Sequence, residues 1–292
     1  MLISTAVFAA ELALIALSFN LIYRVAGFAN FAHGEFVAVG AFVGVTCAQV
    51  MPLWTAAVCA AAATGLIAVG VNLSIFQHFP RAGIGTLMIV SSGLAIALRA
   101  AVQWVFGADV QRYDEPTRQV TLLGAHVSVM HLVIIATAIL AVVAFAVTLR
   151  FTRAGRNMRA IADDIALAEV RGVRSALVVN NVWFISGALA GLAGVLMGID
   201  TYVNPEMGIA ILIPMFAAAI VGGVGSPFGA ILGAVLVSVA QTAVVTIDFG
   251  ALFGGASMHL GSEYKTVVAF ALLIVVLAIR PNGFFGAPEA RA

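Results

Sequence analysis

Polar and flexible residues interrupt an apolar run near the N-terminus, in the segment Gly-Phe-Ala-Asn-Phe-Ala-His-Gly-Glu-Phe at 27–36. The side chains of Asn30, His33 and Glu35 are costly against lipid, so we expect them to face a protein interior or water. No second histidine follows His33 at a zinc-ligand spacing, which favours a hydrogen-bonded buried histidine over a metal ligand. These residues, together with Gly34, are candidates for a translocation path.

A second glycine-rich segment, Gly-Gly-Val-Gly-Ser-Pro-Phe-Gly-Ala at 222–230, lies in the other half of the chain. Glycine-interrupted segments in matching places of two halves point to broken helices beside a translocation path, where helix ends and backbone groups meet the solute. Gly223, Gly225 and Ser226 therefore join the candidate path. A plain turn between two helices would explain these glycines equally well, and both interpretations stay open.

Basic residues gather in the middle of the chain, where six of the 14 Lys and Arg residues lie within 150–174. After Arg159 the segment has helical character. Asp163 and Asp164 suit a helix N-terminus, where carboxylates meet the positive end of the helix dipole, and Gly172 suits a C-terminal stop. We expect a short amphipathic helix over 163–172 at the membrane surface. It is either a spacer, which composition alone favours, or a contact for a partner subunit.

The amino-acid composition indicates that membrane-spanning helices position these candidate residues. Hydrophobic residues make up 63% of the 292 residues and charged residues 9%, against roughly 45–50% and 25% in a soluble domain. This excludes a soluble globular protein. Apolar windows long enough or nearly long enough to cross a bilayer occur at 2–23, 35–51, 53–76, 84–106, 129–149, 177–199, 208–222, 227–247 and 264–280.

We therefore predict an all-α fold, a polytopic transmembrane bundle of eight or nine spans with glycine-broken segments. It forms a single transmembrane domain over 1–292 with a cytoplasmic loop at about 150–176. Arginines retained on the cytoplasmic side fix the orientation, and they place the 150–176 loop, Arg24, Arg81 and Arg280 inside. Nine crossings give an external N-terminus. If 35–51 is re-entrant, eight crossings remain and the N-terminus is internal.

One charge lies in the middle of the first span. Glu11 either pairs with an arginine of a neighbouring helix, such as Arg99, or faces a conduit, and we favour the structural pair.

The absence of several catalytic motifs excludes several classes of enzyme. The chain has no Gly-x4-Gly-Lys-Ser/Thr segment and only one lysine, Lys265, so it cannot hold a P-loop. No His-Glu-x-x-His motif occurs, and Ser, His and Asp are too scattered for a hydrolase. We predict no catalytic residue, no metal ligand and no cofactor in this chain. A net charge of +1 gives no pull toward nucleic acid. Any ATP-driven role therefore requires partner subunits.

Three segments together carry a resemblance to a known family. Ala166-Leu167-Ala168-x3-Gly172 resembles the Glu-Ala-Ala-x3-Gly loop of ABC importer permeases, with Ala166 in place of the glutamate and Leu167 in place of the second alanine. With the glycine-rich segments at 27–36 and 222–233, it occurs in the order and spacing of the H-type permease subunit of branched-chain amino acid ABC importers (LivH-type). The resemblance covers nearly the whole chain.

The resemblance implies a multi-pass permease of the bacterial inner membrane. Its implied partners are a second, M-type permease (LivM-type), two ABC ATPase subunits that bind ATP and Mg, and an extracytoplasmic binding protein for leucine, isoleucine or valine. It also implies that the short surface helix seats in a groove of an ATPase. The residues assigned to this coupling contact are Arg159, Asp163, Asp164, Ala166, Leu167, Ala168 and Gly172.

Two other classes of protein stay open. A secondary transporter or channel for a small polar solute, such as urea or an amide, would also show broken helices. It would work without an ATPase and would need Glu11 and Glu35 for ion coupling or selectivity. A membrane-bound enzyme would need a polar catalytic cluster at one membrane depth, and the sequence shows none.

Overall fold

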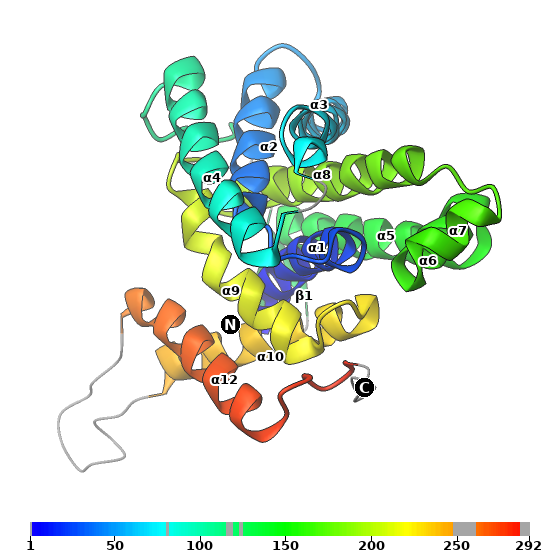
Figure 1. The fold of residues 1–292 in the computed structure, drawn as a ribbon. Helices are drawn as coiled ribbons and strands as arrows, with labels where there is room; N and C mark the ends of the chain where they lie inside the picture. Colours follow the sequence, from blue (N-terminus) through cyan, green and yellow to red (C-terminus); the bar gives the residue numbers. More distant parts are fainter. Residues whose placement is uncertain (1, 80–81, 115–118, 123–124, 248–260, 287–292) are drawn as a thin grey trace.

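Helices form nearly all of the regular structure (Figure 1). The computed structural model describes residues 2–79, 82–114, 119–122, 125–247 and 261–286. The helices are α1 (Leu2–Ala26), α2 (His33–Ala48), α3 (Leu53–Ser74), η1 (Phe76–His78), α4 (Ile84–Phe106), α5 (Val129–Phe151), α6 (Arg153–Asp163), α7 (Ile165–Val170), α8 (Ser175–Asp200), α9 (Met207–Gly222), α10 (Pro227–Thr246), η2 (Ser262–Tyr264) and α12 (Lys265–Ile279). The predicted all-α bundle is confirmed.

Each of the nine predicted apolar windows corresponds to one helix. Six of these helices are long and apolar enough to cross a bilayer, namely α1, α3 with η1, α4, α5, α8 and α10. The other three, α2, α9 and α12, are apolar but have only 16, 16 and 15 residues. Because about 20 residues are needed for a full crossing, the predicted total of eight or nine spans depends on how these three helices lie.

The chain between α4 and α5 contains an antiparallel hairpin that we did not predict. Strand β1 (Gln119–Leu122) pairs with β2 (Ala125–Ser128), with Val120 opposite Val127. Each strand has only four residues, too few for an alternating pattern to stand out from an ordinary loop. Arg81, one of the arginines used for orientation, lies outside the described residues.

Helices α1 and α8 form the centre of the bundle. In each of them 61% of the most apolar window is buried within the chain, whereas in α4 the figure is 6%. Figure 1 shows α4 at one edge, α12 at another, and α6 and α7 beyond the ends of α5 and α8. Most buried polar residues therefore lie on α1, α2 and α8 or on the elements that contact them.

Small residues let the helix backbones approach closely. A Cβ at Gly194 in α8 would overlap the carbonyl oxygen of Val37 in α2, and a Cβ at Gly40 would overlap Gly191. Small residues commonly let helices pack closely in lipid. Lipid tails are as apolar as the side chains, so packing rather than the hydrophobic effect drives helix association there. Gly191 and Gly194 of α8 thus form a helix contact within this chain.

Candidate functional site

An irregular segment at 27–32 leads into α2, and side chains satisfy its backbone. The Asn30 Oδ1 atom accepts a hydrogen bond from Ala32 N at 3.1 Å, and Phe31 N donates to Ser91 Oγ of α4 at 3.1 Å. A non-helical backbone inside a membrane protein is tolerated where such partners exist. The chain is non-helical between α1 and α2, and a role of this segment in a translocation path stays a prediction.

His33 is buried and held by α1. Ser18 Oγ donates to Ile15 O at 2.8 Å and lies 2.8 Å from His33 Nε2. The Nε2 atom of His33 is therefore hydrogen-bonded to the Ser18 hydroxyl, which ties the start of α2 to α1. Among the described residues no cluster of three or more His, Cys, Asp or Glu could hold a metal ion.

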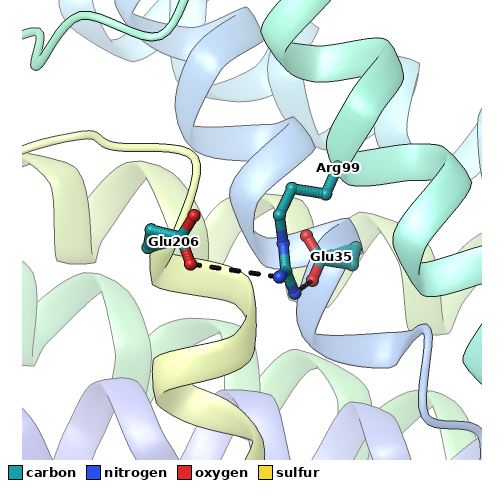
Figure 2. Close-up of polar contacts among 3 residues, drawn as sticks. All are labelled: Glu35, Arg99 and Glu206. Atoms are coloured by element: carbon teal, nitrogen blue, oxygen red, sulfur yellow. Dashed lines mark hydrogen bonds and ion pairs between the residues drawn. The ribbon is translucent and has the colours of Figure 1, made fainter.

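Glu35 forms an ion pair that links three elements. Figure 2 shows Arg99 of α4 reaching toward Glu35 on α2 and Glu206 at the start of α9. Arg99 Nη2 donates to Glu35 Oε1, and Arg99 Nη1 lies 3.9 Å from Glu206 Oε2. The Glu35 side chain is 2% exposed and that of Glu206 is 65% exposed. A buried carboxylate is thus paired with a cation.

The expected pairing of Glu11 with Arg99 is wrong, because Arg99 belongs to Glu35. Glu11 is 2% exposed, and its Oε1 has no hydrogen-bond partner among the described residues. Glu206 was not among the predicted site residues, and the acid paired with Arg99 is Glu35 rather than Glu11. One signal was available: Arg99 is the only charged residue in the apolar window at 84–106. A lone charge in such a window requires a partner.

Gly34 lies where α2 meets the start of α9. A Cβ at Gly34 would overlap the carbonyl oxygen of Gly208, and a Cβ at Gly208 would lie 2.6 Å from Glu35 Oε2. A larger residue at Gly34 would therefore push the two helix backbones apart, whereas one at Gly208 would displace the carboxylate of Glu35. This close approach brings Glu35 beside the backbone of α9.

The second glycine-rich segment is a tight turn between α9 and α10. Ser226 N donates to Gly223 O at 3.1 Å, and Gly223 and Gly225 have φ of 108° and 82°. Asn20 of α1 bonds the turn on both sides, accepting from Gly225 N at 3.4 Å and donating to Ser226 O at 3.3 Å. Ser226 Oγ caps α10 by accepting from Gly229 N at 3.1 Å.

Gly34 and Gly223, one from each glycine-rich segment, lie at opposite ends of α9. Gly34 contacts Gly208 at the start of α9, whereas Gly223 follows the last residue of that helix. A helix of this length separates its ends by about 20 Å. The plain-turn interpretation describes the geometry at 223–226, and any role of this turn in a translocation path remains a prediction.

An apolar cavity of about 260 Å³ lies between α4, α9 and α12. Its walls include Phe31 from the irregular segment, Met88 from α4, Phe216 from α9 and Leu273 from α12. The cavity therefore extends between the same helices α4 and α9 that Arg99 and Glu206 bridge.

Two short helices, α6 and α7, replace the single surface helix expected over 163–172. Arg159 and Asp163 belong to α6, where Arg159 Nη1 donates to Leu149 O and Asp163 Oδ1 lies 3.5 Å from Arg24 Nη2. The second contact places the end of α1 beside this loop. Arg159 and the buried side chains of Met158 and Ile161 thus hold α6 against the bundle, and Asp163 lies at its exposed end.

Asp164 and Gly172 delimit α7 as the sequence predicts. Asp164 Oδ1 accepts from Leu167 N at 2.9 Å and caps the helix. At the other end Val173 N donates to Ala168 O at 3.0 Å and Gly172 N to Glu169 O at 2.9 Å, with Gly172 at a φ of 83°. These paired bonds are a Schellman motif, which favours glycine at this place.

The side chains of α7 divide into two faces. Ala168 is 4% exposed and contacts the bundle, whereas Ile165, Leu167 and Val170 are 48%, 52% and 86% exposed. Ala166 is also exposed. Exposed aliphatic side chains on a short capped helix, outside the apolar spans, are typical of a surface that meets a partner.

Residues 1–277 match the family described as branched-chain amino acid transport system / permease component. This chain belongs to that permease family. The permease protein BraD of the high-affinity branched-chain amino acid transport system of Pseudomonas aeruginosa is 33% identical to it, over 95% of this chain and 92% of BraD. The LivH permease proteins of Salmonella typhimurium and Escherichia coli K12 are 31% and 30% identical, again over 95% of this chain.

A solved structure shares the fold of the permease. PsaBC from Streptococcus pneumoniae, in complex with Fab, superposes with a TM-score of 0.52 over 96% of this chain and 92% of the other, at 14% sequence identity. At that identity the likeness concerns the fold alone. The relatives named above are permease subunits rather than enzymes, and the permease is a multi-pass membrane protein.

Proposed function

We propose that this permease is the membrane-spanning subunit of an ATP-driven importer of branched-chain amino acids in the bacterial inner membrane. Its relatives are named as permeases of high-affinity branched-chain amino acid transport systems. The partners would be a second permease of the LivM type, two ABC ATPase subunits that bind ATP and Mg, and an extracytoplasmic binding protein. Leucine, isoleucine and valine would be the solutes.

The observation that carries the proposal is the geometry of α7. Its two ends are fixed by the Asp164 cap and the Gly172 turn, and its aliphatic side chains Ile165, Leu167 and Val170 are exposed. The buried side chains of Met158, Ile161 and Ala168 attach the α6–α7 unit to the bundle, and the Arg24–Asp163 contact lies where this unit meets the end of α1. Because this helix is capped and attached to the bundle, a movement of an ATPase bound to its exposed apolar face can be transmitted to α1.

The transport cycle would be alternating access. Closure of the ATPase pair on ATP would move α6 and α7, and the bundle would turn its central path from one side of the membrane to the other. The arginines at 150–174 support a cytoplasmic position for this unit. Crossing of the bilayer by α2, α9 and α12, and hence nine spans with an external N-terminus, belongs to the same proposal.

An unaided secondary transporter for urea or amides remains the second candidate class. It requires free intramembrane carboxylates for ion coupling. Glu35 does not fit that role, because Arg99 already neutralises it. Glu11 retains an oxygen without a hydrogen-bond partner among the described residues, and it is the residue on which that alternative depends.

Reconstitution separates the two classes. The permease is placed in proteoliposomes alone, and in parallel with the second permease, the ATPases and the binding protein. We expect leucine uptake only in the complete assembly, with ATP on the side of the ATPases and binding protein on the other. Uptake by the single chain without ATP would contradict the importer and favour the secondary transporter.

A further inference from the structure

Arg99 stands between two acidic side chains from different elements (Figure 2). Glu35 comes from the first turn of α2, and Glu206 is the residue before α9. Both α4 and α9 pack against α2, so the guanidinium group lies between α4 and α9. The two ion pairs differ in length and in burial.

Glu35 holds Arg99 in a fixed position. Its carboxylate is buried, and its Oε1 accepts a hydrogen bond from Nη2 of Arg99. Its Oε2 lies against the backbone of Gly208 and has no hydrogen-bond partner among the described residues. One nitrogen of the guanidinium is therefore committed to a buried anion that the packing of α2 on α9 keeps in place.

Glu206 is held loosely. Its Oε2 lies 3.9 Å from Nη1 of Arg99, which is beyond hydrogen-bond length. An exposed ion pair of this kind contributes little to stability, so Glu206 can turn away at small cost. Within the described part of the chain, Nε of Arg99 also has no hydrogen-bond partner. Arg99 thus keeps donors that a second anion could use.

An amino-acid zwitterion carries one anionic and one cationic group, which can replace the contact between Arg99 and Glu206 by two new ion pairs. Its carboxylate matches the planar N–H fork of Arg99, and its ammonium group matches the carboxylate of Glu206. Binding would replace one long contact by two short ion pairs. Because the zwitterion is neutral, the net charge of the cluster stays the same and no proton has to move.

The apolar cavity lies farther along the same two helices. Met88 in its wall precedes Arg99 on α4, and Ile213 follows Glu206 on α9. The seven residues from Glu206 to Ile213 span about 10 Å of helix. Met88 precedes Arg99 by eleven residues, or about 16 Å of helix. Both separations exceed the length of a leucine side chain, so the cavity is a separate apolar stretch between the same helices and lies beyond a solute bound at Arg99 and Glu206.

We propose that Arg99 and Glu206 form a head-group site for the zwitterion of an aliphatic amino acid, with Glu35 as the positioning residue that holds Arg99. The proposal rests on the importer function, since it supplies the solute class. The proposal adds a specific binding site in this chain for the charged groups of the solute.

Solute protection of an introduced cysteine tests the site directly. Ile209 follows Glu206 by three residues on α9 and is 48% exposed, so Ile209→Cys reports on the same helix face. The variant is made with Cys47→Ser and Cys59→Ser, which remove the two native cysteines. The permease pair with its ATPases, without ATP or binding protein, is then alkylated with N-ethylmaleimide in the presence of leucine, isopentylamine or isocaproate.

We expect leucine to slow alkylation and the two analogues, each lacking one charged group, to have little effect. Adding Glu206→Gln should abolish the protection by leucine, and the matched variant Glu263→Gln, at an exposed acid of η2, should retain it. Equal protection by all three solutes, or protection that survives Glu206→Gln, would overturn the proposal. So would the absence of any protection by leucine.

Transport gives an independent readout. In the complete importer Glu206→Gln should lower the leucine imported per ATP by about tenfold, the loss of one charge-assisted bond to the solute, with unchanged thermal stability. Unchanged import, or a loss of import matched by a loss of stability, would make the cluster a structural clasp only. Failure of the wild-type importer to move leucine with ATP would instead refute the proposed function, which the alkylation experiment does not require.

Discussion

Arg99 joins α4 to the bundle through its ion pair with Glu35, whose side chain is 2% exposed. Little else of α4 is enclosed by the chain, since only 6% of its apolar window is buried. Exposed apolar residues cover the rest of this helix, among them Ile89, Ile96 and Trp104. The position of α4 therefore depends on a few contacts, namely this ion pair, the hydrogen bond from Phe31 N to Ser91 and the packing of Phe106 on Phe42 of α2.

Glu35→Gln should lower the stability of the permease. The variant leaves the Arg99 cation without its buried partner, and the loss of a hydrogen bond to a charged group costs about 1.5–3 kcal/mol. The measurement is denaturant unfolding of the purified permease in detergent micelles. Glu263→Gln, which removes an exposed acid of η2, is the control, and equal stability of the two variants would contradict the structural role of the pair.

Gly34→Ala should be strongly unfavourable, because the new Cβ would overlap the Gly208 carbonyl oxygen. Overpacking at a close helix contact costs about 1–3 kcal/mol. The control is Gly93→Ala in α4, where a Cβ meets nothing within 4 Å. Thermal unfolding of both variants is compared with that of the wild type, and a Gly34→Ala variant as stable as Gly93→Ala would show that α2 and α9 do not pack as described.

Gly194 is not a suitable packing control for substitutions at Gly34 and Gly225. Gly194 is as tightly packed as Gly34, whereas Gly225 has open space around it but a φ of 82°. A substitution at Gly225 therefore tests backbone strain in the α9–α10 turn, and one at Gly34 tests helix contact.

Leu167→Glu and Val170→Glu should uncouple ATP hydrolysis from uptake. Both side chains are exposed, so a charge there disturbs a partner contact while the chain itself remains stable. Ala168→Glu, by contrast, places a charge at a buried position and should destabilise the α6–α7 unit. ATP hydrolysis and leucine uptake are measured in the same proteoliposomes.

The matched control for these variants is Arg156→Ala, at an exposed position of α6. It should leave the number of ATP molecules used per leucine unchanged. If Leu167→Glu and Val170→Glu also leave that ratio unchanged, the exposed face of α7 has no part in coupling.

Asn72 and Asn180 should show measurable coupling in a double-mutant cycle. Asn72 Nδ2 donates to Asn180 Oδ1 at 2.8 Å and links α3 to α8. Hydrogen bonds between helices in a bilayer contribute about 0.6 kcal/mol on average and up to about 1.7. Unfolding of Asn72→Ala, Asn180→Ala and the double variant gives the coupling energy, and additive effects would show that the bond contributes nothing.

Much of the fold is predictable from the sequence because lipid imposes long apolar helices. All nine apolar windows became helices, and Asp164 and Gly172 bound α7 through local capping chemistry. Which helices meet depends on packing that periodicity does not encode. The partner of Arg99 was for this reason assigned to Glu11 rather than Glu35.

The same limit applies to the candidate site. Asn30 and His33 have the buried, hydrogen-bonded positions that polar residues in an apolar run require. The separation of Gly34 from Gly223 along α9, and the approach of Glu206 to Arg99, depend on the three-dimensional path of the chain. Glu206 precedes an apolar helix as an ordinary exposed acid, and nothing in its neighbourhood in the sequence marks it.

Accessibility of α7 tests most directly whether this helix receives the ATPases on the cytoplasmic side. Leu167→Cys, with Cys47 and Cys59 replaced by serine, is treated with a membrane-impermeant maleimide in right-side-out and inside-out vesicles. We predict labelling only in inside-out vesicles, and protection from labelling when the ATPase subunits are added. Labelling from the external side, or equal labelling with and without the ATPases, would contradict the account.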